Sequence, residues 1–197
     1  QKICTTFNYD KVLPMNTGVE GGETAIKISR KWGYEVKNIE PNKAVNLFCY
    51  NNFWGRTLAA VSSSTDPSCF NNFGPFMNGF ECIPYNCLDS LENKFKSNPN
   101  IVSFMLEPIQ GEAGIIIPND GYLKKVKQLC EQYNVLMIAD EVQTGMGRTG
   151  QMLACDYEDI KPDILILGKA LSGGMLPVSA VLADSCIMDV ITPGTHG

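Results

Sequence analysis

The sequence predicts an α/β fold in which a largely parallel sheet is covered by helices. Short apolar runs alternate with segments of helical periodicity along the whole chain, which is the order typical of strands joined by helical crossovers. The chain has 197 residues, of which 44% are hydrophobic, and a chain of this length buries roughly 70% of its unfolded surface. No repeat or linker-like segment divides it, so we expect one large domain.

The individual elements follow from residue spacing. Ala25, Ile28 and Trp32 are spaced as one face of a helix. Residues 62–86 are rich in Ser, Asn, Gly and Pro and predict a long surface loop of the kind that often carries function. Residues 121–134 predict a second helix, because their apolar side chains recur at helical intervals. Apolar runs predict strands at residues 44–50, 101–107, 135–141, 163–169 and 179–184.

Charge and composition exclude several classes of protein. The net charge is -5 and the Lys and Arg residues are scattered, so no basic stripe is available to bind a nucleic acid. The apolar runs fall far short of the roughly 20 residues that cross a bilayer, so no membrane partner is expected. The single histidine, His196, argues against a multi-histidine metal site and against a Ser/His/Asp triad within this chain, and no metal is expected.

The cysteines indicate a reducing compartment. There are eight, with no C-x-x-C pair, and several lie inside apolar runs as buried thiols do, whereas a disulfide framework belongs to short secreted chains. No signal peptide is visible in the sequence, which begins at Gln1. We expect a cytoplasmic protein, with the mitochondrial matrix as the alternative.

Charged residues stand at the ends of two predicted strands. Asp140 and Glu141 end the run 135–141, and a buried strand tolerates carboxylates only at its exposed edge, where ligands bind in open α/β sheets. Lys169 ends the run 163–169 among small residues, where desolvation can turn a lysine into a nucleophilic amine for Schiff base chemistry. Each residue also has an ordinary interpretation, a helix cap for Asp140 and a solvated surface amine for Lys169.

Two glycine-rich segments could contact phosphate groups. Residues 16–24 place small residues where a helix begins, so free backbone N–H groups could hold an anion, although a turn and helix cap explains the segment without a ligand. Residues 145–150 fit G-x-G-x-x-G, the fingerprint of a dinucleotide fold. A short acidic stretch broken by proline follows them, leaving no room for the helix that such folds pack there. A nucleotide-dependent oxidoreductase is therefore a less favoured alternative.

Five motifs, taken in order, resemble those of the class III aminotransferases, which use pyridoxal phosphate. They are T-G-V-E at 17–20, N-F-W-G-R-T at 52–57, E-P-I-Q-G-E at 107–112, D-E-V-Q-T-G at 140–145 and G-K-A at 168–170. Within the class, F-W-G-R-T and the G-V-E-G-G-E-T-A of residues 18–25 resemble the ornithine-specific members. The acetylornithine and 4-aminobutyrate members, which are the alternatives, differ at those two places.

The resemblance implies a fold-type I large domain. Its sheet would be mostly parallel and seven-stranded, with helices on both faces and residues 179–184 as the antiparallel strand. Residues 1–197 would form the pyridoxal phosphate-binding large domain, with an N-terminal segment and a C-terminal small domain absent from this sequence. The resemblance also implies a homodimer whose active site is shared between subunits. A chain that keeps this fold in a regulatory role, without turnover, is the non-enzyme alternative.

The same resemblance implies roles for the residues that would hold the cofactor. Lys169 would carry pyridoxal phosphate covalently and move the substrate proton, while Asp140 would keep the pyridine nitrogen protonated. Gln143 would hydrogen-bond the phenolic oxygen, with Glu107 behind it. The remaining predicted contacts are Phe53 and Val142 on the two faces of the ring and the N–H groups of Gly18 and Val19 at the phosphate.

Three further residues are implied in substrate selection. Arg56, with Trp54 next to it, would bind a substrate carboxylate through a bidentate fork. Glu112 would act as a gate that neutralises an arginine of the C-terminal domain when ornithine is bound and releases it for 2-oxoglutarate. The implied reaction moves the δ-amino group of L-ornithine to 2-oxoglutarate and gives glutamate 5-semialdehyde and glutamate.

Overall fold

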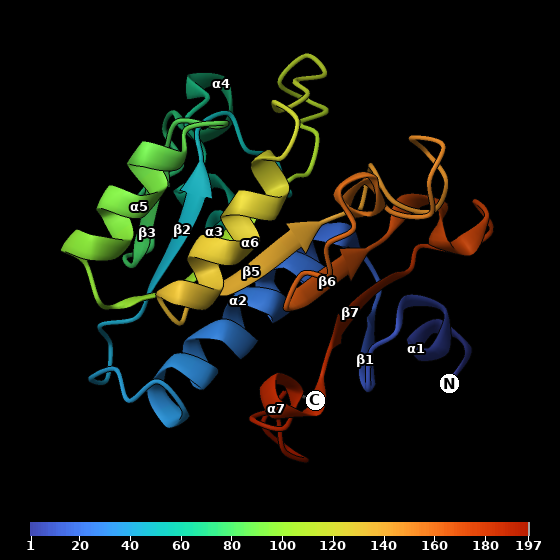
Figure 1. The fold of residues 1–197 in the computed structure, drawn as a ribbon, viewed down its shortest axis with the longest axis horizontal. Helices are drawn as coiled ribbons and strands as arrows, with labels where there is room; N and C mark the ends of the chain where they lie inside the picture. The colour runs from blue at the N-terminus through green and yellow to red at the C-terminus, as the bar shows by residue number, and fades with distance from the viewer. Residues whose placement is uncertain (197) are drawn as a thin grey trace.

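The computed structural model describes residues 1–196 and has a seven-stranded sheet with helices on both faces (Figure 1). The strand order is β1-β7-β6-β5-β4-β2-β3, and neighbours run parallel except at β7, which is antiparallel to both β1 and β6. The predicted fold class is therefore confirmed. The strands are β1 (Lys11–Met15), β2 (Val45–Cys49), β3 (Phe80–Ile83), β4 (Ile101–Leu106), β5 (Leu136–Asp140), β6 (Ile164–Leu167) and β7 (Ser179–Ala183).

Both predicted helices are present, as α2 and α6. The longer, α2, begins at a capping box in which Thr17 Oγ1 accepts the N–H of Glu20 and the Glu20 carboxylate accepts the N–H of Thr17. The helices are α1 (Lys2–Phe7), α2 (Gly18–Glu35), α3 (Leu58–Ser62), α4 (Pro67–Phe70), α5 (Leu88–Ser97), α6 (Tyr122–Gln132) and α7 (Ser185–Met188), with 3-10 helices η1 (Ala154–Glu158) and η2 (Lys169–Ser172).

The segment 62–86, predicted to be a loop, in fact contains α4 and the edge strand β3. β3 pairs in parallel with β2, from Asn46 opposite Phe80 to Cys49 opposite Ile83. Its four residues are mostly half-buried, so the short F-E-C-I sequence shows neither an apolar run nor a clean alternation. An edge strand lacks the two buried faces that make a central strand visible in the sequence.

Successive side chains of each strand point to opposite faces of the sheet, so the apolar core has one part on each face. α2 covers one face, where Ile28 belongs to the same apolar cluster as Ile138 of β5. α5 and α6 cover the other face, where Val126 of α6 belongs to a cluster with Met137 of β5. Because Met137 and Ile138 are consecutive, they point to opposite faces, as the two-residue period of a strand requires.

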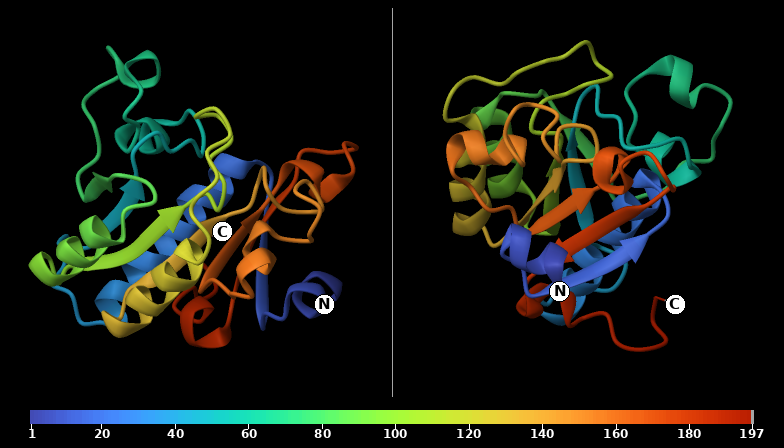
Figure 2. Two further views of the ribbon diagram at one scale, coloured as in Figure 1. Left: turned by 45° about the horizontal axis from the view of Figure 1, so that its top comes forward. Right: turned by 90° about the vertical axis from the view of Figure 1, so that its right-hand side faces the viewer.

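The carboxyl ends of β2, β4, β5 and β6 lie at one edge of the sheet, and the loops that follow them gather there (Figures 1 and 2). Figure 2 shows the segment around α4 rising above this edge. Sites in open α/β sheets form at such an edge. Within residues 1–196, no helix has the length and apolar character needed to span a membrane.

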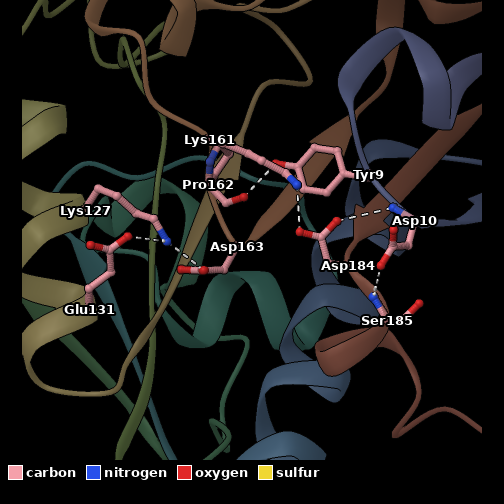
Figure 3. A network of polar contacts seen from close by, with 9 residues as sticks. All are labelled: Tyr9, Asp10, Lys127, Glu131, Lys161, Pro162, Asp163, Asp184 and Ser185. Atoms are coloured by element: carbon pink, nitrogen blue, oxygen red, sulfur yellow. Dashed lines mark hydrogen bonds and ion pairs between the residues drawn. The ribbon is translucent and has the colours of Figure 1, made fainter.

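A network of paired charges lies at the opposite edge, where β6 begins and β7 ends (Figure 3). Lys127 of α6 contacts the Asp163 carboxylate at 2.7 Å, and Asp163 also accepts the N–H of Met137 at 2.8 Å. Lys161 contacts Asp184 at 2.6 Å. These charges find their partners within the chain and join α6, β5, β6 and the end of β7.

Candidate active site

A cavity of about 250 Å³ lies at the carboxyl edge of β4, β5 and β6. It is lined by Gly18, Val19, Phe53, Trp54, Gly55, Glu107, Glu112, Asp140, Val142, Gln143, Thr144 and Lys169. All the residues predicted to hold the cofactor are in this set. Segments that are far apart in the sequence therefore meet at one cavity, as the ends of neighbouring parallel strands allow.

Asp140 ends β5 and lies in the cavity wall with only 7% of its surface exposed. Among residues 1–196 its carboxylate accepts one hydrogen bond, from the N–H of Val142 at 3.1 Å, and forms no ion pair. Burial, reinforced by the nearby Glu107 carboxylate, raises the pKa of Asp140 to about 7. A buried carboxylate with so few partners is suited to pair with a cationic group of a ligand.

Lys169 directly follows Gly168 at the end of β6, the strand that pairs with β5, so Asp140 and Lys169 lie at adjacent strand ends. Its backbone φ is 40°, a left-handed conformation that lysine rarely adopts and that is concentrated at functional sites. The desolvation expected from the sequence is wrong for this chain, because Lys169 is exposed. It begins η2 just beyond the apolar run, and no segment within residues 1–196 covers it.

Glu107, just after β4, organises the two loops beside it. Its carboxylate accepts the N–H of Phe53 at 3.0 Å and that of Gly111 at 3.3 Å. Burial raises the pKa of Glu107 to about 7, although both hydrogen bonds act to lower it. No hydrogen bond joins Glu107 to Gln143 in the described chain, and Gln143 instead donates to Glu112 at 3.2 Å. Glu107 thus positions Phe53 rather than Gln143.

The N-terminus of α2 brings two free donors to the cavity. The N–H groups of Gly18 and Val19 have no acceptor among the described residues. A Cβ atom on Gly18 would lie 2.9 Å from Val142 Cγ1, so glycine is needed for the helix to begin this close to β5. Free N–H groups at the positive end of a helix dipole are suited to bind a phosphate.

The residues predicted to contact substrate are arranged less closely around the cavity. Glu112 lines it with an exposed side chain, whereas Arg56 is exposed and lines a neighbouring cavity of about 570 Å³. The Trp54 indole is only 6% exposed, stacks on Phe48 and donates its Nε1–H to Ser63 Oγ at 2.8 Å. With its ring stacked and its polar atom bonded within the core, Trp54 supports the cavity wall, and its contact with substrate stays a prediction.

Two features of the turn after β5 bear on the site. Thr144, which the sequence analysis left unassigned, lines the cavity and donates its hydroxyl to Glu141, three residues earlier, a spacing that could have signalled a side-chain turn. The glycine motif at 145–150 forms turns with Gly147 and Gly150 at positive φ and leads into the short η1. It therefore lacks the helix that begins directly at a dinucleotide phosphate site.

The residues present fit pyridoxal phosphate. The free N–H groups of α2 suit its phosphate, the buried Asp140 carboxylate suits a protonated ring nitrogen, and the Lys169 amine suits its carbonyl group. Phe53 and Val142 supply apolar surface for a flat ring. No side chain within residues 1–196 other than Lys169 brings a positive charge to the wall of this cavity.

Comparisons with known proteins identify a family and similar relatives. The family model for aminotransferase class-III matches residues 1–197. The ornithine aminotransferase of Drosophila melanogaster, which is named as mitochondrial, is 65% identical over 195 residues, corresponding to 99% of this chain and 45% of its own length. The chain therefore spans just under half the length of this curated relative.

Solved structures agree with the sequence comparison. The ornithine aminotransferase of Toxoplasma gondii superposes with a TM-score of 0.98 and 54% identity, over 100% of this chain and 46% of that one. A second structure of the same protein has pyridoxal phosphate at partial occupancy in its active site. The acetylornithine aminotransferase of Elizabethkingia anophelis matches with a TM-score of 0.85 and 52% identity, over 100% of this chain and 45% of that one.

Proposed function

Since the chain belongs to the class-III aminotransferase family, we propose that residues 1–197 form the cofactor-binding large domain of an ornithine δ-aminotransferase. The proposed reaction moves the δ-amino group of L-ornithine to 2-oxoglutarate through pyridoxal phosphate. The observation that carries the proposal is that Asp140, Lys169 and the N-terminus of α2 line one cavity. The relatives from Drosophila and Toxoplasma support ornithine as the donor.

Pyridoxal phosphate, when bound, supplies an electron sink for the substrate carbon that loses a proton. In the proposal, the N–H groups at the start of α2 bind the phosphate. Asp140 pairs with the ring nitrogen and keeps it protonated, because a cation beside the carboxylate lowers its pKa from about 7. Phe53 and Val142 hold the ring and exclude water from its faces. Lys169 carries the cofactor on Nζ and moves the proton at the substrate carbon.

Gln143 is the proposed partner of the phenolic oxygen. The 107–112 loop holds it in place, because Glu112 accepts its Nε2–H at 3.2 Å. Gly111 makes this contact possible, since a Cβ there would lie 1.7 Å from Gln143 Oε1. Glu107, the first residue of this loop, closes it by accepting the N–H of Gly111 and also accepts the N–H of Phe53, the residue proposed to cover the ring.

Substrate choice depends on Arg56 and Glu112 in this proposal. Arg56 binds a carboxylate through a planar fork of two hydrogen bonds, and Glu112 governs which acid is accepted. The Elizabethkingia structure supports an acetylornithine aminotransferase as a second candidate.

The test of the proposed function is the relative rate with three amino donors. The full-length protein is loaded with pyridoxal phosphate and given L-ornithine, N-acetylornithine or 4-aminobutyrate, each with 2-oxoglutarate. We expect kcat/KM to be highest for L-ornithine by at least about tenfold, which corresponds to about 1.4 kcal/mol of transition-state binding. A preference for N-acetylornithine would establish the second candidate, and a protein that takes up no pyridoxal phosphate would contradict the proposal altogether.

The proposed assembly is a homodimer with an active site shared between subunits. Its support is the exposed apolar surface at the start of α3 and on the segments that follow β4 and η2, where Leu58, Ile115, Ile117, Met175 and Leu176 are between 62% and 83% exposed. Exposed apolar residues on neighbouring loops are typical of interfaces. Light scattering of the full-length protein should give twice the mass of one chain, and a monomer that is fully active would contradict this assembly.

The proposed compartment is the mitochondrion, which was the alternative in the sequence analysis. The support is the name of the Drosophila relative, while the expectation of a cytoplasmic protein has no support among the relatives described above. Fractionation of cells that express the full-length protein tests this placement.

A further inference from the structure

Glu141 is a buried carboxylate to which the proposed mechanism gives no role. It follows Asp140 directly, yet its side chain is turned away from the cavity and is 0% exposed. Three donors reach its two oxygens. The hydroxyl of Thr144 and the N–H of Ala154, at 3.1 Å, donate to Oε2, and the N–H of Cys155, at 2.8 Å, donates to Oε1.

These contacts require a hydrogen-bond acceptor at both oxygens. Two of the donors are backbone N–H groups at the start of η1, which cannot reverse their polarity, and Glu141 has no ion pair among residues 1–196. Burial, together with the Glu141 charge, raises the pKa of the Cys155 thiol well above its usual range. Burying a carboxylate without a cation is unfavourable, and the three hydrogen bonds offset that cost only while Glu141 and η1 keep their relative positions.

The backbone of Glu141 begins the turn that carries the cofactor-facing residues. Its carbonyl accepts the N–H of Gly145 at 2.9 Å, which closes the turn 141–145. From the front of this turn, Val142 lies against Gly18 and Gly168, and Gln143 contacts Glu112. The turn is therefore attached to the cavity at its front and, through the Glu141 side chain, to η1 at its back.

We propose that Glu141 is a positioning residue, whose carboxylate fixes the turn 141–145 to η1 so that Asp140, Val142 and Gln143 remain directed into the cavity. The identity of the ligand rests on the proposed function, whereas the effect on the turn does not. Glutamine cannot replace the carboxylate, since its amide would turn N–H groups toward at least one of the two backbone donors.

The test uses the full-length protein with the substitutions Glu141→Gln and Thr144→Val. In the cofactor-free form, we expect amide hydrogen exchange across 141–145 to accelerate at least about tenfold in Glu141→Gln and less in Thr144→Val. In a titration with pyridoxal phosphate, we expect the dissociation constant to rise by at least about tenfold in Glu141→Gln, the loss expected for hydrogen bonds to a charged group.

Glu158→Gln is the matched control. Glu158 is the last residue of η1, but its carboxylate accepts two backbone N–H groups at the start of α6, those of Gly121 at 3.1 Å and Lys124 at 2.7 Å, and makes no hydrogen bond with the turn 141–145 among the described residues. The Glu158→Gln substitution should lower the unfolding temperature. Amide hydrogen exchange at 141–145 and the dissociation constant for pyridoxal phosphate should stay close to those of the unsubstituted protein.

Two outcomes overturn the proposal. One is unchanged exchange across 141–145 in Glu141→Gln or, if that variant does not fold, in Thr144→Val. The other is an equal change of the dissociation constant in Glu141→Gln and Glu158→Gln. If the unsubstituted protein fails to bind pyridoxal phosphate, the proposed function fails, and the exchange measurement still decides whether Glu141 fixes the turn.

Discussion

The two edges of the sheet at β5 and β6 both contain carboxylates that are at least partly buried, but within residues 1–196 only one edge pairs them with lysines. At the carboxyl edge, Asp140 and Glu107 are buried without an ion pair among the described residues, and burial raises the pKa of each carboxyl to about 7. At the opposite edge, Asp163 is paired with Lys127 (Figure 3). Burial acts to lower the pKa of Lys127, but the Asp163 and Glu131 carboxylates together outweigh it, and the pKa lies above its usual value.

This difference in pairing distinguishes charged residues that bind one another within the fold from charged residues that are available to bind a ligand. At the opposite edge the Lys127 and Lys161 amines are paired with carboxylates of the chain, so removing one partner destabilises the fold by leaving the other charge uncompensated. Within residues 1–196, the carboxyl edge leaves acceptors in Asp140 and donors at the N-terminus of α2 without partners, an arrangement suited to a ligand that carries both a cation and an anion. Substitutions at the two edges should therefore affect different measurements.

The largest expected effect is at Lys169. Lys169→Ala in the full-length protein should lower kcat at least about 10⁴-fold, because it removes both the covalent attachment and the group that moves the proton. Borohydride reduction followed by peptide mapping should place the pyridoxyl label of the unsubstituted protein on Lys169.

Lys161→Ala, at the opposite edge, is the matched control. Lys161 is paired with Asp184 and is far from the cavity wall, so the label and the rate should be retained while stability decreases. A label on another lysine would show that Lys169 has been misassigned.

The next effect is at Asp140. Asp140→Asn keeps the shape but removes the charge, so we expect cofactor to remain bound while single-turnover proton removal slows at least about 100-fold. Asp163→Asn changes the same group at the paired edge and should instead lower the free energy of unfolding, measured in urea, by about 2–3 kcal/mol, because it leaves the partly buried Lys127 with only the more distant Glu131, at 3.4 Å, among its described partners. Equal effects of both substitutions on rate would remove the distinction between the edges.

The sequence predicted the carboxyl edge well because its residues end long apolar runs. Asp140 and Lys169 follow the central strands β5 and β6, whose buried faces make the runs unmistakable. The resemblance to a family then added Phe53 and Val142, which lie on loops that periodicity alone could not have brought together. The edge strand β3 was missed because half-buried residues give a weak pattern.

What the sequence could not supply was the direction of side chains. Asp140 and Glu141 are adjacent and chemically alike, and only the structure shows that one faces the cavity and the other η1. The packing of the Trp54 indole in the core, with its N–H bonded to Ser63, is likewise visible only in the structure. The ion pair of Lys127 and Asp163 joins residues 36 positions apart, a contact that no local spacing reveals.

A smaller effect is expected in the pH dependence of stability. The folded pKa of Asp140 and Glu107 is about 7, whereas carboxyl groups of an unfolded chain titrate near pH 4. The native state thus binds more protons between about pH 4 and 7. The stability contributed by these groups is fully present below about pH 4 and is lost as the pH rises through about 7.

The predicted loss of stability with rising pH is tested in the cofactor-free, full-length protein. Its free energy of unfolding should fall between pH 5 and pH 8, and it should fall less in Asp140→Asn, which has one fewer carboxyl group to titrate. Urea unfolding at the two pH values measures both slopes. A steeper fall in Asp140→Asn would mean that Asp140 is ionised and stabilising in the absence of a ligand.

The smallest effect is expected at Glu112, an exposed carboxylate that, unlike Asp140, is not buried and, unlike Asp163, has no ion pair in the described part of the chain. Its predicted task is to neutralise an arginine that 2-oxoglutarate needs and ornithine does not. Glu112→Ala should therefore raise single-turnover reactivity toward glutamate relative to ornithine by a few-fold, whereas Arg56→Lys should weaken both by about 1–3 kcal/mol through loss of the planar fork. If Glu112→Ala leaves the ratio of glutamate to ornithine reactivity unchanged, the Glu112 carboxylate serves only to hold Gln143. The contrast between the two edges would then concern buried charges alone.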